Sequence, residues 1–116
     1  MDNNNTILNI LFICSRNKRR SLTAEAIFKN NGRHHVTSAG TEESARRRLT
    51  QAMLDNADLI FVMEKRHRDR IQQNFETDKE IIMLNIPDEY EYMDEELVAM
   101  LQDMVNPYLT SSTSAS

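Results

Sequence analysis

The run Ile-Leu-Asn-Ile-Leu-Phe-Ile-Cys at residues 7–14 is the feature that most restricts the fold of this chain. All of its residues except one asparagine are apolar, and most of them favour extended structure. A strand with one face in water would alternate apolar and polar residues, so the run predicts a strand that is covered on both faces. Parallel sheets have this property, because the helices that connect their strands pack on both sides.

Patterns typical of helices and strands alternate along the rest of the chain. A helix is predicted at residues 20–31, where Ala24, Ile27 and Phe28 recur at helical spacing and Gly32 supplies a left-handed terminator. Further helices are predicted at residues 50–57, 64–75 and 94–106, and further strands at residues 34–38, 58–63 and 80–84. The last helix has an apolar face and is expected to end at Asn106-Pro107; the face consists of Leu97, Met100, Leu101, Met104 and Val105.

This alternation predicts one α/β domain, residues 1–109, built in three layers as a four-stranded parallel sheet flanked by helices on both faces. Residues 110–116 contain only Ser, Thr and Ala and are predicted to form a disordered tail. In parallel sheets of this kind, ligands bind beyond the carboxyl ends of the strands. Cys14, residues 38–41, Glu64 and residues 85–92 follow such ends, so they mark the edge where a site is expected.

Composition and charge narrow the classes of function. The chain has one cysteine, which excludes an internal disulfide and fits a reducing compartment, and its longest apolar run is too short for a membrane span, so a cytoplasmic protein is expected. Residues 1–50 carry nine Lys/Arg and four Asp/Glu, whereas residues 51–116 carry five and 14. The acidic second part and the few aromatic residues argue against nucleic acid as a partner, and nothing indicates a membrane partner. A local anion site fits the basic first part better.

The segment Cys-Ser-Arg-Asn-Lys-Arg-Arg-Ser at residues 14–21 lies between a predicted strand and a predicted helix. Five residues can curl so that their N–H groups point inward as an anion-binding nest, and the helix dipole adds positive potential there. Arg20 can then bind two phosphoryl oxygens with its planar guanidinium, and the same field favours the thiolate of Cys14 as a nucleophile. The predicted phosphate-binding loop consists of Ser15, Arg16, Asn17, Lys18, Arg19 and Ser21.

Two residues of this loop have more specific expected roles. The hydroxyl of Ser21 can donate to the sulfur and stabilise it as a leaving group. The loop contains no glycine, so a left-handed backbone position is expected at Asn17, the residue type that tolerates this conformation best after glycine. The alternative interpretation of the segment is a buried Cys14 followed by a solvated basic turn.

A reaction that expels an alkoxide or phenoxide also needs a proton donor, and Asp88 in Ile-Pro-Asp-Glu-Tyr is the candidate. Pro87 stiffens this segment, and Tyr90 is placed to line the mouth of a pocket. The alternative is that Asp88 and Glu89 are ordinary solvated loop charges. Asp94 is better explained as a helix cap.

Other charged segments have simpler interpretations. Arg46-Arg47-Arg48 is a solvated basic run or, alternatively, part of a pocket rim that attracts an acidic partner. Residues 65–70, with His67, are interpreted as an exposed helix face. The three histidines are scattered without metal-binding spacing, so neither a metal ion nor another cofactor is expected.

At these residues the chain resembles the low-molecular-weight protein tyrosine phosphatase family. The matching segments are the Cys-x5-Arg-Ser loop at residues 14–21, Ser-Ala-Gly-Thr at residues 38–41, Asp-Leu-Ile-Phe-Val-Met-Glu at residues 58–64, and Asp88-x-Tyr90. The resemblance implies a two-step mechanism in which Cys14 forms a cysteinyl-phosphate while Asp88 protonates the leaving oxygen and then activates water. It also implies that Asn17 shapes the loop through hydrogen bonds that include Ser38, and that Tyr90 flanks the substrate ring.

The resemblance implies further that the substrate is a phosphotyrosyl protein or a small aryl phosphate, that phosphate-like oxyanions inhibit, and that no metal is used. The chain departs from the usual family pattern in several places. Arg16 stands where a glycine is usual and Arg19 where a second cysteine is frequent, and a stretch between Thr41 and the third strand is missing. Two rival functions remain open: a thiol-dependent arsenate reductase and a catalytically weak phosphoryl-binding regulatory module.

Overall fold

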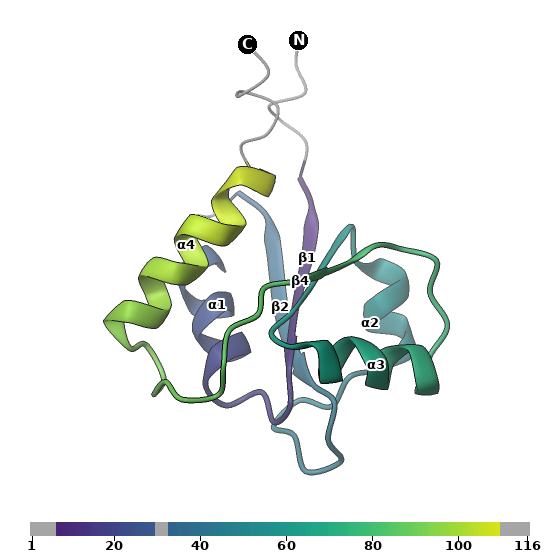
Figure 1. Cartoon of the computed structure of the whole chain (residues 1–116). Coiled ribbons are helices and arrows are strands. Elements are labelled where there is room, and N and C mark those ends of the chain that lie inside the picture. Colours follow the sequence, from purple (N-terminus) through teal and green to yellow (C-terminus); the bar gives the residue numbers. More distant parts are fainter. Residues whose placement is uncertain (1–6, 30–32, 110–116) are drawn as a thin grey trace, which may run out of the picture.

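Strands and helices alternate along the chain in the order that the sequence predicts (Figure 1). The structure, a computed structural model, describes residues 7–29 and 33–109. Gly32, predicted to end a helix, and the tail predicted at residues 110–116 lie outside these residues. The elements are β1 (Asn9–Cys14), α1 (Arg20–Lys29), β2 (His35–Gly40), α2 (Gln51–Asn56), β3 (Leu59–Val62), α3 (Lys65–Asn74), β4 (Ile81–Met83) and α4 (Glu95–Leu109).

All four strands of the sheet run parallel, in the order β2-β1-β3-β4. The central strand β1 pairs with both neighbours, so that Phe12 lies opposite Ser38 on one side and Phe61 on the other. Every residue of β1 from Ile10 to Cys14 is buried, which explains the continuous apolar run. The predicted α/β class with a four-stranded parallel sheet is confirmed.

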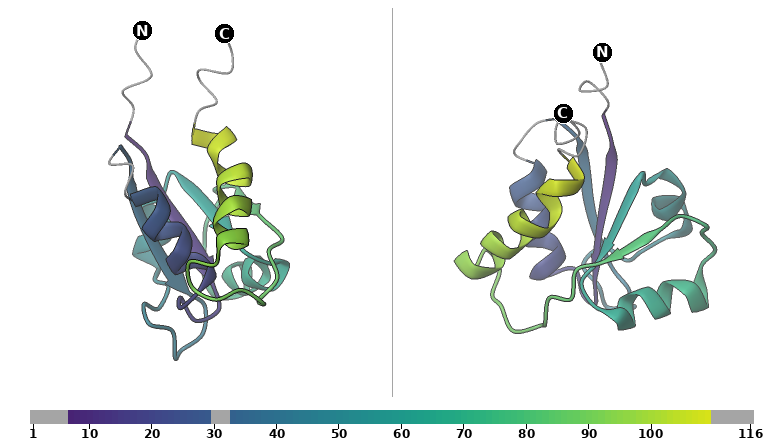
Figure 2. Two further views of the ribbon diagram at one scale, coloured as in Figure 1. Left: turned by 90° about the vertical axis from the view of Figure 1, so that its left-hand side faces the viewer. Right: turned by 45° about the horizontal axis from the view of Figure 1, so that its top comes forward.

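Two apolar clusters cover the two faces of the sheet. Figures 1 and 2 show α1 and α4 on one face and α2 and α3 on the other, which makes three layers. Successive residues of β1 point to opposite faces, so Phe12 joins the α1/α4 cluster whereas Ile13 joins the α2/α3 cluster. Phe12 stacks on Phe28 and Phe61 with ring centroids 5.6 and 5.2 Å apart. Full burial of side chains of this size stabilises the fold by roughly 1.5–3 kcal/mol each.

The predicted end of the last helix is wrong. Helix α4 continues through Pro107 to Leu109, although proline lacks the N–H that would bond to the carbonyl four residues earlier. Contacts beyond the proline offset this loss: the ring of Tyr108 meets Phe61 edge-on with centroids 5.3 Å apart, and Leu109 packs against the same cluster. Among the described residues, no helix combines the length and the apolar character that a membrane span requires.

The carboxyl ends of the strands lie at one edge of the sheet, and β1 and β2 end at the bottom of Figure 1. Cys14 and Gly40 are paired there as the last residues of β1 and β2. The absence of a side chain at Gly40 lets three segments meet, because a Cβ at this position would lie 2.5 Å from both the carbonyl oxygen of Ser15 and the Cβ of Ala45. Gly40 is therefore required by close approach of the loops that follow β1 and β2.

We expect the substitution Gly40→Ala to destabilise the domain by about 1–3 kcal/mol, because the new methyl group can be accommodated only if backbone moves. Thermal unfolding should show a melting temperature lowered by roughly 5–15 °C. The control is Thr37→Ala, at an exposed position of the same strand, which should change stability by less than about 1 kcal/mol. Equal melting temperatures for Gly40→Ala and the wild type would contradict the close packing.

Candidate functional site

The sulfur of Cys14 lies inside the loop that joins β1 to α1. It accepts the backbone N–H of Asn17 at 3.3 Å and lies 2.9 Å from the hydroxyl oxygen of Ser21. Asn17 has a φ of 60°, the left-handed conformation expected of it in a glycine-free loop. The side chain of Cys14 is only 3% exposed, but its sulfur is held by polar groups of the loop. The thiol is therefore part of a polar site and is not inert core filler.

The carbonyl groups of this loop are turned outward and are bound by the segment that follows β2. Residues 41–46 supply a donor to each of four successive carbonyls, so the N–H groups of the loop are left to face its interior. The bonds are Thr41 N to Cys14 O at 3.0 Å, Glu42 N to Ser15 O at 3.0 Å, Arg46 N to Arg16 O at 2.9 Å and Arg46 Nε to Asn17 O at 3.3 Å. Arg46 thus supports the loop, a role that the interpretation of Arg46-Arg47-Arg48 as a solvated run did not include.

A chain of hydrogen bonds behind the loop fixes the direction of the Ser21 hydroxyl. The side-chain amide of Asn17 donates to Ser21 Oγ and to Ser38 Oγ, both at 2.8 Å, and Ser38 in turn donates to the carboxylate of Glu25. Because Ser21 Oγ already accepts from the amide, its own hydrogen is free to point at the sulfur of Cys14. Sequence reasoning missed Glu25, although its position four residues after Ser21 places both on one face of α1.

The guanidinium of Arg20 is held in place from two other strand ends. Arg20 is 2% exposed, and its Nη1 donates to Glu64 Oε1 at 3.0 Å and to the carbonyl of Ile86 at 2.7 Å. Its Nε lies 3.8 Å from Asp88 Oδ1. Neither hydrogen bond uses Nε or Nη2, so this edge can make a two-oxygen contact with a phosphoryl group if the ion pair with Asp88 gives way to the substrate.

Glu64 is the counterion that keeps this buried cation in place, and sequence reasoning gave it no role beyond its position at the sheet edge. Partial burial raises the pKa of Glu64, but hydrogen bonds from Arg20 and Arg66 outweigh burial, and the net shift is downward. The carboxylate therefore stays charged at neutral pH. Removing one partner of such a pair leaves an uncompensated buried charge, which is strongly destabilising.

His67 was predicted to lie on an exposed helix face, and this prediction is wrong. The residue is 1% exposed, and its Nε2 lies 2.9 Å from Ser15 Oγ beneath the loop. Its Nδ1 accepts the backbone N–H of Glu64 at 3.0 Å, so the hydrogen of the neutral ring is on Nε2 and is donated to Ser15. Burial, together with the charges of Arg20 and Arg66, lowers the pKa of His67 to about 4. The signal in the sequence was Ile71, four residues later on the same helix face and fully buried.

The loop opens into a hollow of about 380 Å³ at the predicted edge of the sheet. Charged and polar side chains line most of it: Cys14, Ser15, Arg16, Lys18, Arg19, Arg20, Glu42, Arg66 and Asp88. Of the residues predicted for the site, Asn17, Ser21 and Ser38 are buried and do not line the hollow. Tyr90 does not line it either; the tyrosine packs against the α1/α4 cluster with its hydroxyl 3.4 Å from Glu96 Oε2. In the described part of the chain, no three His, Cys, Asp or Glu residues are grouped to hold a metal ion.

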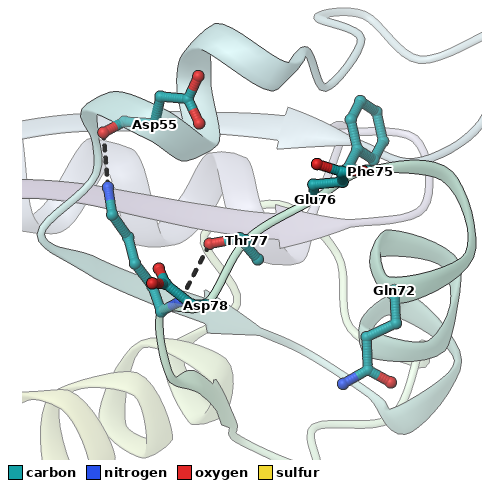
Figure 3. A pocket seen from close by; sticks show the side chains of 7 residues that line it. Asp55, Gln72, Phe75, Glu76, Thr77 and Asp78 are labelled. Carbon is teal, nitrogen blue, oxygen red and sulfur yellow. Dashed lines mark hydrogen bonds between the residues drawn. The ribbon is translucent and has the colours of Figure 1, made fainter.

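A larger hollow, of about 580 Å³, lies between α2, α3 and the segment before β4 (Figure 3). It is lined by Asp55, Gln72, Phe75, Glu76, Thr77, Asp78 and Lys79. The ammonium of Lys79 is already used there, because it donates to the carbonyls of Leu54, Asp55 and Ala57 at the end of α2 at 2.9, 2.5 and 2.6 Å. Among the described residues that line this hollow there is no thiol, and Lys79 is the one cation, so the hollow around Cys14 is the candidate active site.

Comparison with known proteins agrees with the choice of the hollow around Cys14 as the candidate active site. Residues 9–53, which include β1, the loop and Gly40, match the family described as "Low molecular weight phosphotyrosine protein phosphatase". No curated protein matches the sequence. The match over residues 9–53 agrees with the family that the sequence resembles, and the solved structures confirm the predicted fold.

Solved structures share the fold over nearly the whole chain. A low molecular weight phosphotyrosine phosphatase from Vibrio cholerae O395 is 17% identical with a TM-score of 0.75, covering 94% of this chain and 99% of its own. The tyrosine phosphatase Wzb from Escherichia coli K30, solved with phosphate, is 21% identical with a TM-score of 0.74, covering 91% and 99%. The YwlE arginine phosphatase from Geobacillus stearothermophilus is 18% identical with a TM-score of 0.64, covering 94% and 97%. At these identities the likeness concerns the fold.

The neutral, buried state of His67 predicts how stability depends on pH. The pKa of His67 is about 4 in the folded protein against an ordinary value of 6.5, so the unfolded chain takes up the proton first as pH falls. The contribution of His67 is therefore complete above pH 6.5 and is lost between pH 6.5 and 4, a change of about 3 kcal/mol. Urea unfolding of the wild type and of His67→Gln across this range should differ by that step. Parallel pH profiles for the two proteins would contradict a neutral buried imidazole.

Proposed function

We propose that this chain belongs to the low-molecular-weight phosphotyrosine protein phosphatase family, whose model it matches over residues 9–53, and that it hydrolyses phosphomonoesters through a cysteinyl-phosphate intermediate on Cys14. The observation that carries the proposal is the environment of the sulfur, which accepts the Asn17 N–H at 3.3 Å and lies 2.9 Å from Ser21 Oγ. The loop around it has turned its carbonyls outward, and Arg20 is fixed beside it. A thiolate and a phosphoryl dianion both find hydrogen-bond donors there.

In the first step, the thiolate of Cys14 attacks the phosphorus in line, a sulfur–phosphorus bond forms, and the ester oxygen leaves with the bonding electron pair. The inward N–H groups and the Nε–Nη2 edge of Arg20 stabilise the charge on the equatorial oxygens of the transition state. Asp88, which lines the hollow, donates its proton to the leaving oxygen. The products of this step are the alcohol or phenol and the cysteinyl-phosphate.

In the second step, the ionised carboxylate of Asp88 takes a proton from a water molecule that attacks the phosphorus from the side vacated by the leaving group. The sulfur–phosphorus bond breaks, its electrons return to sulfur, and inorganic phosphate is released. The hydroxyl of Ser21, oriented by Asn17, stabilises the departing thiolate. No outside thiol is consumed in this cycle.

The position of Asp88 is coupled to that of Arg20, because both are fixed by the same loop. The carbonyl of Ile86, two residues before Asp88, accepts from Arg20 Nη1 at 2.7 Å, and Ile86 itself is fully buried. The side chain of Asp88 is half exposed, which gives its carboxylate access to substrate and water. The proposed acid is thus anchored by its neighbour and remains free to exchange protons.

The substrate class proposed is an aryl phosphate, with phosphotyrosine in a protein as the main case, in line with the family match over residues 9–53. Phosphate-like oxyanions should compete, as the E. coli Wzb structure with phosphate indicates for that relative. A cytoplasmic location is part of the proposal, because the free thiol of Cys14 must stay reduced to act as the nucleophile. Tyr90 remains the residue proposed to flank the substrate ring, which requires the ring to leave its packed position.

Replacement of the nucleophile tests the proposal directly. We expect Cys14→Ser to lower the turnover of p-nitrophenyl phosphate by roughly 10⁴-fold or more, because a serine hydroxyl in this loop is not ionised. Binding of inorganic phosphate, followed by calorimetric titration, should persist because the N–H groups and Arg20 are unchanged. The assay contains no added thiol, and Ser44→Ala, at an exposed position, serves as control. A thiol requirement in the wild type would favour arsenate reduction, and full activity in Cys14→Ser would exclude the mechanism.

Replacement of the proposed acid should have an effect that depends on the leaving group. We expect Asp88→Asn to slow hydrolysis of phenyl phosphate by about 10²–10³-fold and that of p-nitrophenyl phosphate by only about tenfold, because p-nitrophenolate leaves without a proton. The readout is kcat for both esters at one pH. Glu89→Gln is the matched control and should leave both rates nearly unchanged. Equal losses for the two esters in Asp88→Asn would exclude Asp88 as the acid.

A further inference from the structure

The hollow around Cys14 is lined mainly by charged side chains, whereas a site for aryl phosphates would be expected to contain aromatic side chains. None of the described residues that line it is aromatic or branched aliphatic. Five of its nine lining side chains are cationic, and Asp88 and Glu42 are the two carboxylates among them. Arg20 binds the phosphoryl group in the proposed mechanism. The other cations are therefore placed to contact the part of a substrate that surrounds the phosphoryl group.

These cations differ in whether the protein already neutralises them. Arg16 lies 3.5 Å from Glu42 Oε1, and Arg66 lies 2.8 Å from Glu64 Oε1. Lys18 and Arg19 are exposed, and within residues 7–29 and 33–109 no carboxylate lies within ion-pair distance of either. Two positive charges that line the hollow therefore have no counterion in the part of the chain that the structure describes.

The exposed run of Arg46, Arg47 and Arg48 extends this positive surface. Its backbone lies against the same loop and the end of β2, since Arg46 N donates to Arg16 O at 2.9 Å and Arg47 O accepts from Gly40 N at 2.8 Å. The surface is local, because the whole chain carries a net charge of -4. A positive region on an acidic protein attracts anions to that region and repels them elsewhere, which steers a substrate toward the hollow.

We infer that the preferred substrate carries a second anionic group beside the phosphoryl group, namely acidic side chains next to the phosphorylated residue of a protein. This inference rests on the proposed phosphatase function. Lys18 and Arg19 bind the flanking carboxylates at the mouth of the hollow, and the arginine run lies where a longer acidic segment continues. A phosphorylated protein is favoured over a small molecule because the basic surface includes Arg46–Arg48, which do not line the hollow itself and would contact a segment of chain that continues beyond it.

The experiment compares two phosphotyrosyl peptides that differ only in their flanks, Asp/Glu in one and Asn/Gln in the other. Each exposed ion pair contributes about 1.5- to 5-fold, so kcat/KM of the wild type should favour the acidic peptide about five- to tenfold at low ionic strength. The preference should fall toward twofold or less in about 1 M salt, where the screening length is about 3 Å. A ratio near one at low ionic strength would overturn the inference.

The double variant Lys18→Ala/Arg19→Ala should lose most of this preference, and Lys18→Glu/Arg19→Glu should invert it. The ratio is measured within each variant, so a change in the basal rate cancels. The matched control is Arg33→Ala/Arg70→Ala, which removes two exposed cations that do not line the hollow and should keep the wild-type ratio. A preference that survives in Lys18→Ala/Arg19→Ala, or disappears equally in the control, would overturn the assignment to these residues.

Two further arms separate this inference from the proposed function. If the wild type does not hydrolyse p-nitrophenyl phosphate, the proposed function fails, and binding of the two peptides to Cys14→Ser, measured by fluorescence anisotropy, then decides the inference by the same ratio. If the wild type does hydrolyse the ester but the two peptides react equally well, only the inference fails.

Phenyl phosphate and 3-carboxyphenyl phosphate are compared in the same way as small-molecule substrates. A preference for the anionic substrate that is found only in this pair would overturn the inference that the substrate is a phosphorylated protein.

Discussion

The site depends on one constraint, the outward direction of the carbonyls between Cys14 and Asn17. A carbonyl oxygen that faced the interior would repel both a thiolate and a phosphoryl group, and a buried carbonyl without a donor is costly. The segment 41–46 removes both problems by supplying a donor to each of these carbonyls. The approach of that segment depends in turn on Gly40, where a side chain would collide with Ser15 and Ala45. The geometry of the proposed anion site at the end of β1 thus depends on the residues that follow β2.

A second constraint is the buried charge of Arg20. A guanidinium that is 2% exposed must be paired and hydrogen-bonded, and its partners come from Glu64 after β3 and Ile86 after β4. His67 adds a link from the same region to Ser15. The four strand ends are thereby joined around the proposed anion site. Residues from position 14 to position 88 therefore meet at one edge of the sheet, although the family match covers only residues 9–53.

The sequence predicted those features that depend on local pattern. The buried run at residues 7–14 indicated the central parallel strand, and the lack of glycine in the loop located the left-handed position at Asn17. Glu25, Glu64 and His67 were missed as site residues because their roles come from contacts between elements distant in sequence, and the spacing of Glu25 from Ser21 and of His67 from Ile71 shows a shared helix face but not the partner. The end of α4 was missed for a related reason, since packing of Tyr108 on Phe61 outweighs the preference of proline to stop a helix.

The way in which residues 41–46 support the Cys14 loop determines which changes of sequence this edge of the molecule can accept. Three of the four donors are backbone amides, which every residue except proline possesses. Side chains in this segment other than that of Arg46 can therefore be exchanged, and the charge of this edge of the molecule with them, while the backbone support of the Cys14 loop keeps its geometry. An insertion would have a larger effect, because one extra residue between Glu42 and Arg46 would move the donors of Arg46 away from their acceptors. Diversification at this edge is expected to proceed by substitution at constant length.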